Sequence, residues 1–413
     1  MKNKKTQVSL IKRIWLVLAV LGPGLITASA GNDAPGIATY SMAGSRYGYN
    51  FLWLILLVTI GGIFIQEMAA RLGAVTGKGT ADLIREKFGV KMTLLAMVCL
   101  LLANFGTTIA EFAGIAAGAE LLGMNRYIVI PIASITIALL AVRGSYKVVE
   151  KLLLVLCLSA IAYVISAFII KPDWGEVLQA AVTPHIILES DYIIAVLATI
   201  GTTITPWGIF YIQASVVDKG VEVQNYGLTK MDVVAGALWG NLISAFIIIT
   251  TGATLFVMGI HVEEANQAAL ALEPLAGSWA KLLFASGLVG ASVLAAMVLP
   301  LSTVYAITEA FGWERGLDQK RRDAPVFYGL LLGVIGLSSL FVLIPGLPLF
   351  RIMLLSQTMN AIILPVLLVL ILILANDREI MGVWRNKRVQ NIFSIFLTVA
   401  IAAISIALFI LQF

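Results

Sequence analysis

Apolar residues in this chain are grouped into long runs that short polar segments separate. A helix needs about 17–25 largely apolar residues to cross a bilayer. Eleven runs reach this length, and polar residues inside them are scarce. The expected spans are residues 14–43, 50–71, 92–122, 127–142, 148–170, 192–217, 231–259, 280–310, 326–345, 351–375 and 391–412. The pattern predicts an all-α, polytopic membrane protein with one transmembrane domain over residues 1–413.

Two of these spans are interrupted near their middle by proline and glycine. Residues 31–36 read GNDAPG and place the carboxylate of Asp33 at the first interruption, and residues 201–208 read GTTITPWG in the sixth span. Broken backbone at membrane depth is tolerated only where it is buried in protein or lines a cavity, and its freed carbonyls can then bind an ion. The alternative is two ordinary proline kinks, with Asp33 as a structural hydrogen-bonding group. The pair of breaks with its acid favours a binding site.

Each interrupted span opens a half of the chain with a comparable number of crossings. Residues 14–170 form the first half, residues 192–375 form the second, and residues 391–412 add an eleventh span. This outline is typical of an inverted five-plus-five repeat, in which spans one and six are broken and the substrate site lies between them.

The distribution of Lys and Arg predicts the orientation of the chain in the membrane. With the N-terminus inside, 23 of the 28 basic residues fall in cytoplasmic segments. Positive residues concentrate on the cytoplasmic side of membrane proteins. We therefore expect a multi-pass protein of the cell membrane with its N-terminus cytoplasmic and its C-terminus outside.

Composition excludes several other classes of protein. The chain is 60% hydrophobic and 12% charged, with a mean hydropathy of +0.97, whereas soluble chains average about 25% charged residues. The net charge of +5 comes from short loops between spans, so it does not indicate a nucleic-acid partner. Both histidines, His185 and His261, lie in loops, so we expect no hydrolytic enzyme and no cofactor.

Polar side chains within the spans are the candidates for function. Interhelical hydrogen bonding is the favoured interpretation of most of them, and Glu67 is expected at the membrane interface. Every candidate ligand offers an oxygen atom. At the two interruptions these are the Asp33 carboxylate, the freed carbonyls near residues 31–34 and 202–205, and the Thr205 hydroxyl. The tenth span adds the Gln357 amide. Other polar residues within spans are Glu111, Asn241, Glu309 and Asn360.

An all-oxygen site predicts a hard divalent cation. Carboxylate, carbonyl and water ligands suit Mg²⁺, Ca²⁺ and Mn²⁺, whereas softer metals prefer sulfur or imidazole. Neither interruption has a neighbouring Met, Cys or His. One carboxylate cannot neutralise a dication, so the ion is expected to retain water, which suits Mg²⁺.

Several motifs resemble those of the Nramp (natural resistance-associated macrophage protein) family, which carries divalent metals on a LeuT-type fold. The resemblance covers most of the chain. It is carried by residues 22–26 (GPGLI), residues 71–83 (RLGAVTGKGTADL), Ala110-Glu111 with Gly114, and Leu355-Ser356-Gln357 with Leu364-Pro365. It implies a LeuT-type fold with eleven transmembrane helices and a metal site at the two broken helices.

The site departs from the family pattern at its ligands. Asp33 matches the first-span aspartate, but Gly36 stands in the place of the asparagine ligand, and Thr202 and Thr205 replace the Ala and Met of the sixth span. Trp207 replaces a histidine linked to proton movement. Thr108 stands where the family has a proton-linked Asp, while Glu111 is retained as a weak candidate for a proton path.

These losses resemble the Nramp-related magnesium transporters, although the sixth-span threonines differ from that branch and Thr205 also resembles the plant aluminium-transporting branch. The leading interpretation is an alternating-access transporter of Mg²⁺, also accepting Mn²⁺, with weak or no proton coupling. Its expected metal site is Asp33, Gly36, Thr202, Thr205 and Gln357. One alternative is a proton-coupled Mn²⁺/Fe²⁺ transporter. Two others are a small organic solute symporter, such as an amino-acid carrier, and a membrane sensor that binds an ion without moving it.

Overall fold

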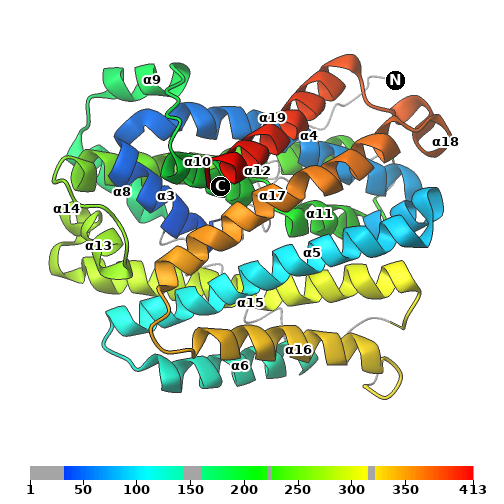
Figure 1. Ribbon diagram of the computed structural model, residues 1–413, viewed down its shortest axis with the longest axis horizontal. Coiled ribbons are helices and arrows are strands. Elements are labelled where there is room, and N and C mark those ends of the chain that lie inside the picture. The colour runs from blue at the N-terminus through cyan, green and yellow to red at the C-terminus, as the bar shows by residue number, and fades with distance from the viewer. Residues whose placement is uncertain (1–31, 144–159, 222, 224–225, 315–320, 413) are drawn as a thin grey trace, which may run out of the picture.

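The computed structural model describes residues 32–143, 160–221, 223, 226–314 and 321–412, and these form helices and their connections without a strand (Figure 1). Eight helical stretches in this part of the chain are long and apolar enough to cross a membrane, and α6 and α8 are shorter apolar helices. The principal helices are α3 (Ala34–Tyr47), α4 (Leu52–Thr76), α5 (Thr80–Leu121), α6 (Arg126–Arg143), α8 (Ile161–Ile170), α10 (Ser190–Thr203), α11 (Pro206–Asp218), α12 (Tyr226–Thr251), α15 (Ala280–Phe311), α16 (Pro325–Val342), α17 (Leu349–Asn376) and α19 (Arg388–Gln412). The all-helical membrane fold expected from the sequence is confirmed.

Breaks between helices occur where the sequence places glycine and proline. The sixth expected span is divided into α10 and α11, which begins with Pro206. Of the first span, α3 is the second half, and residues 14–31 lie outside the described residues, as do residues 148–159 of the fifth span. Gly89, with a φ of 74°, separates the short N-terminal part of α5 from its long apolar part, because glycine readily adopts a positive φ.

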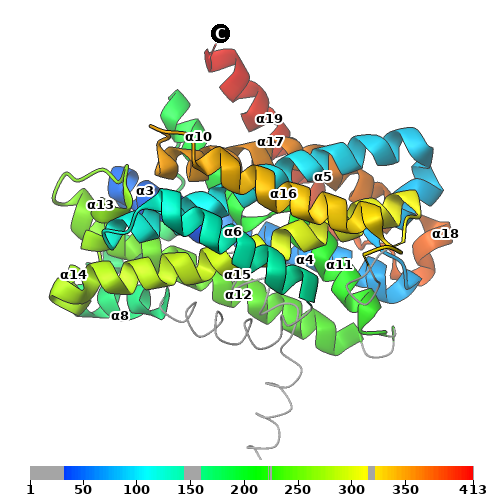
Figure 2. The ribbon, with the colours of Figure 1, turned by 90° about the horizontal axis from the view of Figure 1, so that it is seen from below.

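Helices α5 and α15 lie side by side, with α6 and α16 along one flank (Figures 1 and 2). Glycines bring these long helices together: a Cβ added at Gly118 of α5 would lie 2.6 Å from Val289 Cγ2 of α15. Small residues at helix interfaces let backbones approach closely in a membrane, where van der Waals packing drives association. Helix α17 packs against both α5 and α10 and so joins the pair to the broken span.

Short helices outside the spans gather at the two ends of the molecule. At one end lie α9 (Trp174–Val182), α13 (Ala265–Leu270) and α14 (Glu273–Ala276), and at the other lies α18 (Arg378–Met381) (Figure 1). The first three belong to segments expected on one side of the membrane and α18 to a segment expected on the other side, so the two ends agree with the expected alternation of the spans.

Glu67, expected at the membrane interface, is buried within the protein. Its Oε1 pairs with Arg71 Nε at 3.3 Å and accepts a 2.6 Å hydrogen bond from the Tyr226 hydroxyl. Its Oε2 accepts from Gln390 Nε2 at 2.9 Å, and Arg71 also donates to Asn386. A buried acid is tolerated here because the protein supplies both a counter-charge and hydrogen-bond donors.

Candidate functional site

Asp33 begins helix α3 and is almost completely buried. Its Oδ1 accepts a hydrogen bond from the Gly36 N–H at 2.8 Å, and its main-chain carbonyl accepts from Ile37 N at 2.9 Å. This is an N-cap, and Pro35 fits the first turn because the N–H that it lacks has no helical partner there. The Asp33 carbonyl is therefore part of the helix and is not one of the freed carbonyls expected at this break.

The α10–α11 break frees a carbonyl at the negative end of a helix. Thr202 lies four residues before Pro206, which has no N–H to donate to its carbonyl, and no backbone N–H among the described residues donates to it. The C-terminal end of a helix carries a partial negative charge that favours a cation. The buried Thr202 thus offers a main-chain oxygen in a favourable position.

Gln357 approaches this break from α17. A Cβ added at Gly201 would lie 1.9 Å from the Gln357 carbonyl oxygen, so α10 and α17 are in contact next to Thr202. The Gln357 side chain is buried, its Nε2 lies 3.2 Å from Ser356 Oγ, and its Oε1 accepts from Asn360 Nδ2 at 3.0 Å. The side-chain amide is therefore held in one orientation beside the broken span.

Glu111 brings a second carboxyl group to Asp33. It is fully buried on α5, and its side chain interacts with the Asp33 carboxyl group. The contact arises because Gly114, one turn farther along α5, has no side chain: a Cβ there would lie 2.3 Å from Ala34 Cβ and 2.3 Å from Ser292 Oγ. Two carboxylates this close repel each other when both are ionised, unless a proton or a cation lies between them.

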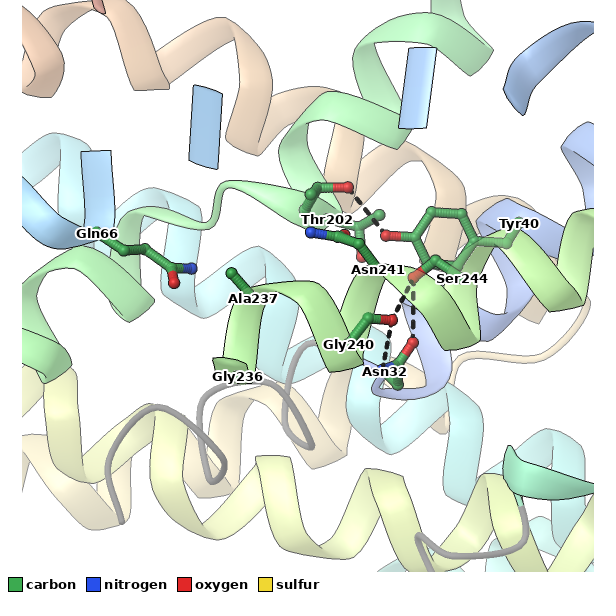
Figure 3. Close-up of a pocket in the computed structure, with 10 residues that line it drawn as sticks. Asn32, Tyr40, Gln66, Thr202, Gly236, Ala237, Gly240, Asn241 and Ser244 are labelled. Carbon is green, nitrogen blue, oxygen red and sulfur yellow. Dashed lines mark hydrogen bonds between the residues drawn. The ribbon is translucent and has the colours of Figure 1, made fainter. Parts of the chain in front are cut away.

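A polar cavity of about 30 Å³ lies next to Asn32, the residue before Asp33, between α3, α4, α10 and α12 (Figure 3). Oxygen- and nitrogen-bearing side chains line most of its wall, and no sulfur atom does. Its lining residues are Asn32, Tyr40, Gln66, Thr202, Thr203, Gly236, Ala237, Gly240, Asn241 and Ser244. A cavity with so many polar partners suits water.

Hydrogen bonds hold the cavity wall together across the broken helices (Figure 3). Asn32 Nδ2 donates to the Gly240 carbonyl at 3.2 Å, and Asn32 Oδ1 accepts from Ser244 Oγ at 3.2 Å. The Tyr40 hydroxyl lies 3.0 Å from Thr203 Oγ1. Helix α3 and the residue before its N-cap are thus tied to α12 on one side and to α10 on the other.

Of the expected metal site, Thr202 lines the cavity together with Asn32, the residue before Asp33, and Gln357 contacts Gly201, the residue before Thr202. Gly36 lies beside Asp33, where it supplies an N–H donor and has no side-chain ligand to offer. Thr205 caps α11, its hydroxyl oxygen accepting from Gly208 N at 3.3 Å, and it does not line the cavity. Thr205 and Gly36 therefore shape the two helix ends that surround the site.

Sequence reasoning assigned no role at the site to Asn32, Tyr40 or Ser244, all of which line the cavity. Asn32 directly precedes Asp33, and Ser244 lies four residues after Gly240 on α12, so one helix face contacts Asn32 at both positions. Tyr40, seven residues after Asp33, faces the same cavity. The spacing of polar residues along α3 and α12 is the signal that could have indicated them.

A family model described as natural resistance-associated macrophage protein-like matches residues 24–411. A curated relative, the divalent metal cation transporter MntH of Erwinia tasmaniensis, is 27% identical over 396 residues, which cover 94% of this chain and 93% of the relative.

Solved structures share the fold. The manganese transporter of Eremococcus coleocola, in complex with an aromatic bis-isothiourea compound, matches with a TM-score of 0.70 and 21% identity over 98% of this chain and 88% of that one. MhsT in complex with L-phenylalanine matches with a TM-score of 0.60 and 14% identity, over 94% of this chain and 98% of that one.

Proposed function

The chain belongs to the Nramp family of membrane transporters, and from that premise we propose that it carries a hard divalent cation, Mg²⁺ first and Mn²⁺ also, across the cell membrane by alternating access. It is a transporter and not an enzyme. Its transported ion is a substrate, held by the broken helices while the site is exposed first to one side of the membrane and then to the other.

The observation that carries the proposal is the contact between the carboxyl groups of Asp33 and Glu111. Both groups are buried, they interact with each other, and no Lys or Arg among the described residues forms an ion pair with Asp33. An acid in the membrane interior is costly unless a positive charge compensates it. A divalent cation between the two groups would supply that charge, and the Thr202 carbonyl at the end of α10 would supply a further ligand.

The preference for hard ions rests on the chemistry of the surrounding atoms. Carboxylate, carbonyl, amide and hydroxyl oxygens surround the site, and no group of three or more His, Cys, Asp or Glu exists in the described part of the chain. Mg²⁺ dehydrates reluctantly and keeps several waters when it binds to one or two carboxylates. The polar cavity lined by Asn32 and Thr202 has a volume of about 30 Å³, room for about two waters.

Weak proton coupling follows from the residues that replace titratable groups. Thr108 donates its hydroxyl hydrogen to the Asn104 carbonyl at 2.7 Å within α5, and Trp207 is buried on α11. Neither side chain can carry a proton across the membrane. Glu111 favours the second candidate function, a proton-coupled Mn²⁺/Fe²⁺ transporter, because its carboxyl group could take up a proton as Asp33 binds metal.

We also propose the orientation, with the N-terminus cytoplasmic and the C-terminus outside, from the excess of Lys and Arg on one side of the spans. Under this orientation the buried Glu67–Arg71 pair lies at the cytoplasmic end of α4. Cysteine accessibility at Lys219 and at Lys171 would test it: the first should be labelled only from inside and the second only from outside.

Uptake into proteoliposomes tests the function. We expect both Mg²⁺ and Mn²⁺ to enter, each competing with the other, without acidification of the lumen beyond that of protein-free vesicles. Mn²⁺ uptake that millimolar Mg²⁺ does not reduce would contradict the hard-ion proposal. Acidification coupled to Mn²⁺ entry would favour the proton-coupled alternative.

A further inference from the structure

Asn360 of α17 connects the proposed ligand Gln357 to helix α5. Its Nδ2 donates to Gln357 Oε1 at 3.0 Å and to Thr107 Oγ1 at 2.9 Å. All three side chains are buried. The spacing of three residues places Gln357 and Asn360 on the same face of α17, so one amide group bridges the ligand and a neighbouring helix.

The direction of these hydrogen bonds is determined by their neighbours. Thr107 donates its own hydroxyl hydrogen to the Ala103 carbonyl at 3.0 Å, so its oxygen is left to accept from Asn360. Ser356 donates to the Met353 carbonyl at 2.8 Å, so its oxygen is left to accept from Gln357 Nε2. Each amide therefore has one orientation that satisfies its surroundings, and Gln357 Oε1 is the acceptor.

This arrangement affects how Gln357 can bind a cation. A carbonyl oxygen has two lone pairs, so Oε1 can accept from Asn360 and bind a metal ion at the same time. The hydrogen bond from Asn360 prevents the amide from turning its NH₂ group, which a cation would repel, toward the site. Asn360 Oδ1 is buried and makes no hydrogen bond to any described residue, and such a group in a buried network indicates a role beyond packing.

Through Thr107, Asn360 also contacts the part of α5 that carries Glu111. Thr107 lies four residues, about one helical turn, before Glu111, which interacts with Asp33. Asn360 thus ties the helix that carries Gln357 to the helix that carries Glu111.

We infer that Asn360 is a positioning residue, which holds the Gln357 side-chain carbonyl oxygen toward the transported cation. The inference rests on the proposed function, because it assigns Asn360 an effect only through a metal ligand. It predicts a weaker apparent affinity without Asn360, while the maximal rate, set by the movement of the helices, changes little.

The test is a double-mutant cycle on Mg²⁺ and Mn²⁺ uptake in proteoliposomes. Asn360→Leu, which removes the donor and is somewhat larger, should raise KM roughly five- to tenfold, the effect of one buried hydrogen bond, with kcat within about twofold. Gln357→Ala should raise KM as well. Adding Asn360→Leu to Gln357→Ala should raise KM no further, because coupled residues are not additive.

Asn360→Ala, which needs no additional space, is measured beside Asn360→Leu in case the larger residue impairs folding. Asn376→Ala is the matched control. Asn376 lies on the same helix, but it donates to the Leu372 carbonyl and to Asn391 Oδ1, so its loss should leave KM unchanged. Equal KM increases from Asn360→Leu with and without Gln357 would overturn the inference, and so would an unchanged KM in the single variant. Absence of uptake by the wild type would instead contradict the proposed function.

Discussion

Two buried acidic regions in this protein differ in how their charge is compensated. Glu67 has a full set of protein partners: the guanidinium of Arg71, the hydroxyl of Tyr226 and the amide of Gln390. Asp33 accepts one N–H from Gly36 and faces the carboxyl group of Glu111. Both acids lie on apolar helices, so their burial alone does not distinguish them.

The difference separates a structural acid from a functional one. Removing one partner from a buried ion pair leaves an uncompensated charge, so the Glu67 region is expected to contribute to stability. The Asp33 region has more negative charge than its described surroundings neutralise, so it is expected to bind a cation from outside the protein. Function should therefore be sensitive at Asp33 and stability at Glu67.

Asp33→Ala should have the largest effect, a loss of Mg²⁺ and Mn²⁺ uptake of at least about a hundredfold, because the principal charge that binds the dication is removed. The variant should still purify as a folded protein, since Asp33 supplies one helix cap, worth only about 1 kcal/mol. Uptake in proteoliposomes and the melting temperature check both statements. Near-normal uptake would remove Asp33 from the site.

Glu67→Ala should show the reverse pattern, with a loss of about 3–5 kcal/mol in stability because Arg71 is left buried without its counter-charge. Any folded protein should keep the wild-type KM for Mg²⁺. Replacing both Glu67 and Arg71 with Met should restore part of the stability. Denaturation monitored by intrinsic tryptophan fluorescence measures this, and an unchanged melting temperature in Glu67→Ala would argue against the comparison.

Thr205→Met should shift selectivity toward Mn²⁺ by about tenfold relative to Mg²⁺, because a thioether is a softer ligand than a hydroxyl. The shift should grow when Gly36→Asn is added. Thr205→Val is the matched control: like Met, it removes the cap on α11 at a cost of about 1 kcal/mol, but it adds no sulfur. An equal change in Mn²⁺ over Mg²⁺ selectivity in Thr205→Met and Thr205→Val would show that the lost cap, and not the sulfur atom, causes it.

Glu111→Gln should have the smallest effect and leave proton movement nearly unchanged, because we propose that proton co-transport is weak or absent. Luminal pH during Mn²⁺ uptake, with the membrane potential clamped, should change no more in the wild type than in this variant. Acidification that is present in the wild type and lost in Glu111→Gln would show that the carboxyl pair carries protons as well as metal.

Much of the fold could be predicted from the chain, because apolar runs of membrane length leave few alternatives to helices. The break between α10 and α11 was predictable from Pro206, and the bend in α5 coincides with Gly89. The position of Asp33 at a helix end also followed from its sequence neighbours. These features depend on residues close together in the chain.

Contacts between distant segments could not be predicted in the same way. Glu111 was identified as a polar residue within a span, but its approach to Asp33 depends on the absence of a side chain at Gly114. The hydrogen bonds of Glu67 with Tyr226 and Gln390 could not be predicted because these partners lie far away in sequence. Only the packing of the helices reveals which acid has been neutralised.

Thermal unfolding with and without Mg²⁺ tests the central claim, that Asp33 holds the cation, most directly, since it needs no transport. A ligand that binds the folded state at about a hundred times its Kd stabilises it by about 2.7 kcal/mol. We predict that saturating Mg²⁺ raises the melting temperature of the wild type, and of any folded Glu67→Ala protein, but not that of Asp33→Ala. An equal rise in Asp33→Ala would contradict the account.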